Sequence, residues 1–199
     1  MRGVLNFIIK PLNNSRYNNE VKVGDKKLIV NSDNFQHQFV NREAKVLAIP
    51  SASDTYIQVG DTVIVHHNIF RRWKDIRGKE QNSKSYYKDD MYFVYEDQIF
   101  LYKHKDAWKA NKGFCFVKPI KSNDIFSKDK EKPLVGIMKY PDECLIKAGI
   151  ETGDLVGFKP NTEYEFIIDN QKLYRIYSHS ITVKHEYQGN EKEYNPSWA

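Results

Sequence analysis

The chain has 199 residues, of which 40% are hydrophobic and 29% are charged, and its formal net charge is +5. This length suits one ordinary domain or two small ones, and the composition allows a buried core. No run of about eighteen uncharged apolar residues occurs, which excludes a helix that spans a membrane. The N-terminal residues lack the apolar core of a signal peptide, so we expect a cytoplasmic protein.

The cysteines and the charge pattern exclude two further classes. Only Cys115 and Cys144 occur, which excludes a fold held by a disulfide framework, and their apolar neighbours predict two buried thiols. Basic residues are interleaved with acidic ones along the whole chain, and such a mixed surface serves mainly solubility.

Short strands follow one another along the chain, because apolar residues mostly alternate with a period of two. The expected strands cover residues 7–12, 45–50, 59–65, 91–95 and 99–102. Residues 70–88 mix basic and aromatic side chains, with a turn expected near Arg77 and Gly78. No stretch of a dozen residues has the apolar stripe of a helix. The sequence therefore predicts an all-β fold.

An internal repeat is the most informative feature of the sequence. Four segments of the first half are echoed in the same order in the second half. The pairs are 7–12 with 115–120, 45–50 with 136–141, 59–65 with 152–158, and 94–99 with 176–181. The offsets are 108 (Pro11 to Pro119), 91 (Pro50 to Pro141), 93 (Gly60 to Gly153) and 82 (Tyr95 to Tyr177). Because length differences between copies normally lie in loops, two loops of the second copy are shorter than those of the first.

A Gly-Asp pair opens one strand in each copy, as Gly60-Asp61 and Gly153-Asp154. A strand that starts directly after a tight turn needs a residue that tolerates a positive φ, which glycine supplies. The adjacent aspartate accepts hydrogen bonds from amides of the turn. The motif therefore predicts the same turn in both copies.

These segments, in their order, resemble the GroES family of ring-forming co-chaperonins. The family pattern runs from an opening strand with a basic-Pro pair, through a loop with an apolar tripeptide, to three further strands. The matching segments are Ile9-Lys10-Pro11-Leu12, Leu28-Ile29-Val30, Arg42 to Ile49, Val59 to Val65 and Tyr95 to Tyr102. The resemblance implies two tandem GroES-like small β-barrels.

The expected domains are a barrel at 1–106 with a long mobile loop at about 13–41, a degenerate barrel at 113–187, and a C-terminal tail at 188–199. The segment between Pro50 and Val59 is too short for the hairpin that roofs cellular members of the family. Shortened roofs resemble phage-encoded co-chaperonins, and the doubling resembles the tandem co-chaperonins of plastids. A phage-encoded protein would act in the host cytoplasm.

The resemblance implies a co-chaperonin that caps a GroEL-type chaperonin and assists ATP-dependent folding, with the ATP bound by the partner. Leu28, Ile29 and Val30 would be the chaperonin-binding residues, in a homo-oligomeric ring. Ile125 and Phe126 form the corresponding apolar pair of the second copy and would be a second anchor. The alternative for residues 28–30 is a strand of the core, because polar residues bound them on both sides.

Other constellations support other functions less well. His66 and His67 are neighbours on an expected strand and would point to opposite faces, so we expect no metal site. The 70–88 segment matches surfaces that bind nucleic acid, which is the less favoured partner. No phosphate-binding glycine loop, G-x-S-x-G motif or dinucleotide fingerprint occurs, so we expect no enzyme, no catalytic residue and no cofactor. A virion structural or assembly protein with the same fold is the remaining alternative.

Overall fold

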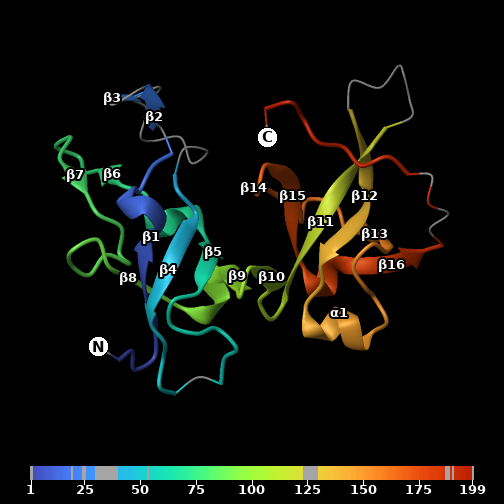
Figure 1. Cartoon of the computed structure of the whole chain (residues 1–199), viewed down its shortest axis with the longest axis horizontal. Coiled ribbons are helices and arrows are strands. Elements are labelled where there is room, and N and C mark those ends of the chain that lie inside the picture. Colours follow the sequence, from blue (N-terminus) through green and yellow to red (C-terminus); the bar gives the residue numbers. More distant parts are fainter. Residues whose placement is uncertain are drawn as a thin grey trace. The chain divides into compact units, whose positions relative to one another are not determined.

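The computed structural model describes residues 2–18, 20–23, 26–29, 40–52, 54–122, 130–186, 189 and 191–198, with only the backbone described for 20–23 and 26–29. Strands dominate, which confirms the all-β class (Figure 1). The chain divides into two compact units, Met1–Ala107 and Trp108–Ala199. No helix in the described part is long and apolar enough to cross a membrane.

The first unit contains most of a six-stranded sheet in the order β10-β9-β5-β4-β1-β8, whose edge strand β10 extends past Ala107, the last residue of that unit. Its strands are β1 (Phe7–Pro11), β4 (Glu43–Ala48), β5 (Thr62–Val65), β8 (Tyr92–Val94), β9 (Ile99–His104) and β10 (Ala107–Ala110). Two small sheets accompany it, formed by β2 (Glu20–Val23) with β3 (Lys26–Ile29) and by β6 (Trp73–Lys74) with β7 (Glu80–Gln81). Short 3-10 helices are η1 (Leu12–Asn14), η3 (His67–Ile69) and η4 (Glu96–Gln98).

The second unit contains a six-stranded sheet in the order β14-β15-β11-β12-β13-β16. Its strands are β11 (Phe114–Lys121), β12 (Glu131–Tyr140), β13 (Leu155–Phe158), β14 (Tyr164–Ile168), β15 (Gln171–Tyr177) and β16 (Ile181–His185). The helix α1 (Glu143–Lys147) and the 3-10 helix η5 (Ser178–Ser180) connect strands. Among the described strands, each six-stranded sheet keeps two unjoined edges, so closure into two barrels is not confirmed.

Five strands of each sheet follow the same order. β8-β1-β4-β5-β9 in the first unit corresponds to β15-β11-β12-β13-β16 in the second. The registers also agree, because Ile9 pairs with Val46 and Val117 pairs with Met138, with an irregularity directly before Ile9 and before Val117. Val46 and Met138 are 92 positions apart, so the offset of 91 expected for this strand is wrong by one residue. Ile137 and Met138 are both apolar and buried, so hydrophobicity alone does not fix the register.

The Gly-Asp turn is the same in both units, as the sequence predicts. Gly60 has φ 94° and Gly153 has φ 99°. The Asp61 carboxylate accepts a hydrogen bond from the Gln58 amide at 2.8 Å, and the Asp154 carboxylate accepts one from the Glu151 amide at 2.7 Å. The turn therefore fixes the start of β5 and of β13 in one geometry.

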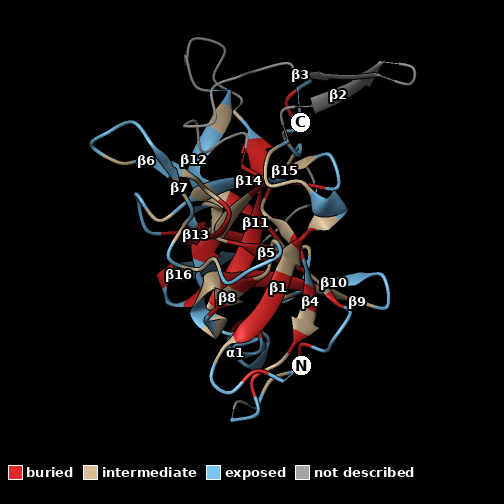
Figure 2. Ribbon diagram, turned by 90° about the vertical axis from the view of Figure 1, so that its left-hand side faces the viewer, coloured by how far each residue is buried: buried red, intermediate tan, exposed pale blue. Residues whose placement is uncertain are grey.

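Each unit has its own hydrophobic core, and buried residues occupy most of β1 and of β11 (Figure 2). Cys115 belongs to the core of the second unit, and burial raises the pKa of its thiol. Cys144 is exposed, so the prediction of a buried thiol is wrong there. Cys144 lies in the first turn of α1, which turns Leu145 inward instead.

The C-terminal segment pairs with the end of β11. Glu193 forms an antiparallel bridge with Ile120, and the Tyr194 amide donates to the Pro119 carbonyl at 2.9 Å. The Lys118 ammonium pairs with the Glu193 carboxylate. The Asn195 side chain accepts a hydrogen bond from the Lys172 amide at 2.9 Å and donates one to the Asn170 carbonyl at 3.0 Å, whereas Trp198 remains 64% exposed.

Candidate binding arm of the first unit

The segment between β1 and β4 begins and ends in a bonded stem. Tyr17 forms an antiparallel bridge with Val40, and the Asn41 amide donates to the Arg16 carbonyl at 2.9 Å. The Asn41 side chain is 4% exposed and donates to the carbonyls of Leu12 at 3.2 Å and Ser15 at 2.8 Å. These contacts fix residues 15–17 and 40–41, which the sequence places inside a mobile loop.

The same stem is held by the insertion between β5 and β8, residues 66–91. The Arg16 guanidinium donates to the carboxylate of Asp90 at 2.8 Å and to the side-chain oxygen of Asn82 at 2.7 Å. The guanidinium carbon also lies 5.2 Å from the centre of the Tyr86 ring. The Tyr17 hydroxyl accepts from the Arg72 amide at 2.9 Å. The stem is therefore bonded to the sheet and to the insertion.

Between the two halves of the stem, the described backbone forms a hairpin. β2 and β3 are antiparallel, and the register pairs Val21 with Leu28 and Glu20 with Ile29. Among the described strands, β2 and β3 pair only with each other, and they lie beyond one end of the six-stranded sheet (Figure 1). We call β2, β3 and the stem the binding arm. Leu28 and Ile29 thus lie in a strand outside that sheet, while Val30 lies outside the described residues.

The corresponding connection of the second unit is shorter. The Ser122 amide donates to the Lys130 carbonyl at 2.9 Å, and Lys121 pairs with Glu131. These bonds close the base of the connection directly at its ends. Ile125 and Phe126, the expected second anchor, lie outside the described residues.

The two adjacent histidines do not point to opposite faces. The rings of His66 and His67 stack, with their centres 4.3 Å apart, because β5 ends at Val65 and a 3-10 helix begins at His67. The Nδ1 atom of His66 accepts a hydrogen bond from the Asn68 amide. In the described part of the chain, no group of three His, Cys, Asp or Glu side chains has the geometry of a metal site.

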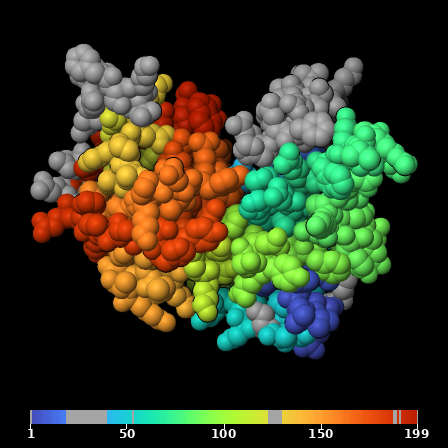
Figure 3. All heavy atoms as spheres, turned by 180° about the vertical axis from the view of Figure 1, so that it is seen from behind, coloured from blue at the N-terminus to red at the C-terminus, as the bar shows by residue number. Residues whose placement is uncertain are grey.

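The insertion combines packed and exposed aromatic side chains. Phe70 is buried, and Tyr86 packs against the core, so neither presents a free face to a base. Trp73 and Tyr87 are half exposed. The part of the chain that contains this insertion is drawn in turquoise to green in Figure 3. The expected turn is confirmed, with Gly78 at φ 74°. Two of the four aromatic side chains of 70–88 thus pack against the sheet, and the other two are exposed.

Sequence reasoning missed the residues that fix the arm, which are Arg16, Tyr17 and Asn41. Their partners lie up to 74 positions away along the chain, and such pairings leave no local pattern. No protein-family model matches this chain, and no curated protein shows significant sequence similarity to it.

Proposed function

We propose that the chain is a co-chaperonin of the GroES type, which caps a GroEL-type chaperonin through its binding arm. The observation that carries the proposal is a hairpin containing Leu28 and Ile29 on a bonded stem, outside the six-stranded sheet. Such an arm presents a short apolar segment to a groove on another protein. In the folding cycle of the chaperonin, the partner binds ATP and this chain carries out no reaction.

The ordered motifs support the same proposal. The opening Lys10-Pro11 pair, the arm, the strand β4 and the Gly60-Asp61 turn follow one another as in the GroES pattern. The second unit repeats this order around Lys118-Pro119 and Gly153-Asp154. A chain with two units of the same strand order is suited to forming a ring of several copies, because equivalent surfaces recur around the ring.

The energetics favour a contact that forms and dissociates. Burial of three aliphatic side chains contributes roughly 5–9 kcal/mol, and ordering a segment removes about 2–5 kcal/mol of that gain. The bonded stem reduces the ordering cost, because less backbone must be fixed on binding. One arm therefore binds weakly, and a ring of arms gains avidity of roughly 10²–10⁴.

An open sheet edge supports assembly of copies into a ring. β16 pairs with β13 on one side and with no described strand on the other. Residues 182–185 of this strand are exposed. Unpaired backbone groups at such an edge are a template for a strand of another copy.

The test is co-migration with a chaperonin on a sizing column. The full chain and a variant with Leu28, Ile29 and Val30 changed to Ser are each mixed with the host chaperonin and ATP. We expect the natural chain to elute with the chaperonin and the triple variant to elute free.

A matched control changes Ile76, which is fully exposed at the tip of the other hairpin, to Ser. This variant should still elute with the chaperonin. If the natural chain elutes free in every condition, the co-chaperonin proposal is wrong, and the virion and nucleic-acid alternatives take its place.

A further inference from the structure

Two equivalent tyrosines have different surroundings in the two units. Tyr92 lies opposite Ile9 in the first sheet, and Tyr174 lies opposite Val117 in the second. Tyr92 is 1% exposed, whereas Tyr174 is only partly buried. The difference identifies a place in front of the tyrosine that is filled in the first unit and that the described residues of the second unit leave open.

In the first unit, the insertion 66–91 fills this place. The Phe70 ring packs edge-on against the Tyr92 ring, with centres 4.8 Å apart and planes at 81°. Tyr86 packs on the same ring at 5.5 Å, and Ile69 completes the cluster. An aromatic side chain is thus the natural occupant of the space in front of this tyrosine.

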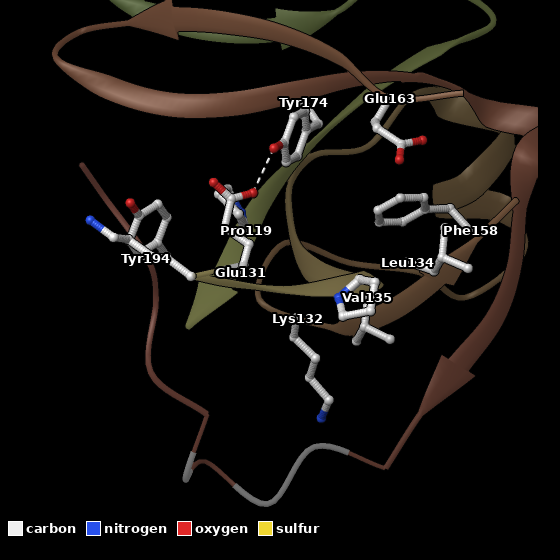
Figure 4. A pocket seen from close by; sticks show the side chains of 11 residues that line it. Pro119, Glu131, Lys132, Leu134, Val135, Phe158, Glu163, Tyr174 and Tyr194 are labelled. Atoms are coloured by element: carbon white, nitrogen blue, oxygen red, sulfur yellow. Dashed lines mark hydrogen bonds between the residues drawn. The ribbon is translucent and has the colours of Figure 1, made fainter. Parts of the chain in front are cut away.

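In the second unit, the corresponding connection between β13 and β15 is 11 residues shorter, as the offsets of 93 and 82 require. Its residues form β14, which pairs with β15 on the side away from β11. A pocket of about 450 Å³ remains in front of Tyr174 (Figure 4). Phe158, Val135 and Leu134 form its apolar side, and Tyr194 of the C-terminal segment forms another wall.

The polar groups of this pocket are arranged around the tyrosine. The Tyr174 hydroxyl donates to the Glu131 carboxylate at 2.5 Å, which orients the ring (Figure 4). The Lys172 ammonium donates to the same carboxylate at 2.6 Å and balances its charge. Glu163 lines the pocket beside Phe158 and is exposed. The pocket therefore joins an apolar surface to two carboxylates, of which Glu131 is bonded to Tyr174 and Lys172 while Glu163 is exposed, and Lys130 and Lys132 complete its polar lining.

We propose that this pocket binds an aromatic side chain of a partner polypeptide, with a basic residue next to it in the partner's sequence. The ring packs edge-on against Tyr174 and on Phe158, in the place that Phe70 takes in the first unit. The basic residue pairs with the exposed carboxylate of Glu163 in the pocket lining. This binding surface is additional to the arm and does not require a chaperonin.

The probe is a peptide with the sequence of residues 67–72 of this chain, compared with a copy carrying Phe70→Ala. Each is titrated into the full chain, and binding is followed by NMR shifts of backbone amides. We expect shifts at Val135, Phe158 and Tyr174, and roughly 10- to 150-fold weaker binding of the alanine copy, because a phenyl group is no longer buried.

Three variants of the protein locate the site. Val135→Trp fills the pocket and should abolish binding, whereas Val183→Trp, at an exposed position outside the pocket, should leave it unchanged. Glu163→Gln should weaken binding about two- to five-fold, the range of an exposed ion pair.

The proposal is overturned if the natural peptide produces no shifts at millimolar concentration, or if both peptides bind equally. Equal binding by the Val135→Trp and Val183→Trp variants would also overturn it. If Val135→Trp fails to fold, the comparison of the two peptides and the binding of the Glu163→Gln variant still test whether the pocket binds the Phe70 side chain.

Discussion

Asp154 shows how one side chain joins a turn to a neighbouring strand. Burial alone would raise the pKa of its carboxyl, but the hydrogen bonds from the Glu151 amide and the Lys184 ammonium lower it below the ordinary value. In the first unit, Asp61 makes the same turn bond and contacts His104 at 2.8 Å instead of a lysine. The two units thus share the backbone conformation of the Gly-Asp turn, while the side chain that pairs with the aspartate differs between them.

The two glycines of this motif should be equally sensitive to substitution. A Cβ at either position meets no atom within 4 Å, but both residues have a positive φ. Gly60→Ala and Gly153→Ala should each destabilise their unit by roughly 1–2 kcal/mol through backbone strain alone. Urea unfolding measures this, with Ala52→Gly in an exposed turn as a control. A cost in one unit only would contradict the equivalence of the turns.

Tyr174 links the open pocket to the stability of the second unit. Burial and the bond to Glu131 raise the pKa of its hydroxyl to about 12. The neutral form is therefore stabilised in the folded chain, and this stability is present below pH 10 and is lost as the pH rises toward 12. Tyr174→Phe should cost about 1 kcal/mol near neutral pH, the value of one hydrogen bond.

The dependence of the free energy of unfolding on alkaline pH tests whether the Tyr174 hydroxyl is held in its neutral form. In urea unfolding, the advantage of the natural chain over Tyr174→Phe should shrink between pH 10 and pH 12. Comparison with the variant cancels the titration of those tyrosines and lysines that do not interact with Tyr174, which excludes Lys172. A difference that stays constant over this interval would show that the hydroxyl is not held in its neutral form.

At the scale of elements, the stem separates the β2–β3 hairpin from the six-stranded sheet. Asn41 donates two hydrogen bonds and accepts one from the Glu43 amide at 2.9 Å, so it satisfies backbone groups at the end of β1 and the start of β4. A buried side chain with three such bonds orders the connection from its base.

Asn41→Ala should therefore weaken the first unit and leave the second unchanged. Loss of these bonds leaves buried backbone groups unsatisfied, and we expect a cost of roughly 2–3 kcal/mol. Hydrogen exchange resolved by residue is the measurement, with faster exchange in β1 and β4 and unchanged exchange in β11 and β12. The control is Lys147→Ala at an exposed position of α1 in the second unit.

The sequence predicts those elements whose information is local. The Gly60-Asp61 turn, the strand β5 and the repeat follow from residue type and spacing. Cys144 could not be placed correctly, because its apolar neighbours suggested burial while α1 faces only Leu145 inward. The stem and the pocket depend on contacts between segments that are distant in the sequence. The shorter β13–β15 connection nevertheless indicates that the second unit lacks part of the 66–91 insertion of the first.

For the whole molecule, the division into two units predicts independent folding. The described residues of each core cluster come from one unit only. Fragments 1–112 and 111–199, cut so that β10 stays with its sheet, should each unfold cooperatively in urea and show dispersed amide signals. A fragment that remains unfolded would show that its core needs the rest of the chain.

If the chain forms the proposed ring, the β2–β3 hairpin determines how many hairpin arms the ring carries. The described hairpin β2–β3 is present in the first unit, while the matching connection of the second is closed between Ser122 and Lys130. A ring built from these chains would then carry one hairpin arm for every two sheets. The number of β2–β3 hairpins in such a ring is half the number of its folded units. A partner with more equivalent grooves than arms would keep some grooves vacant, and these would stay accessible while the ring is bound.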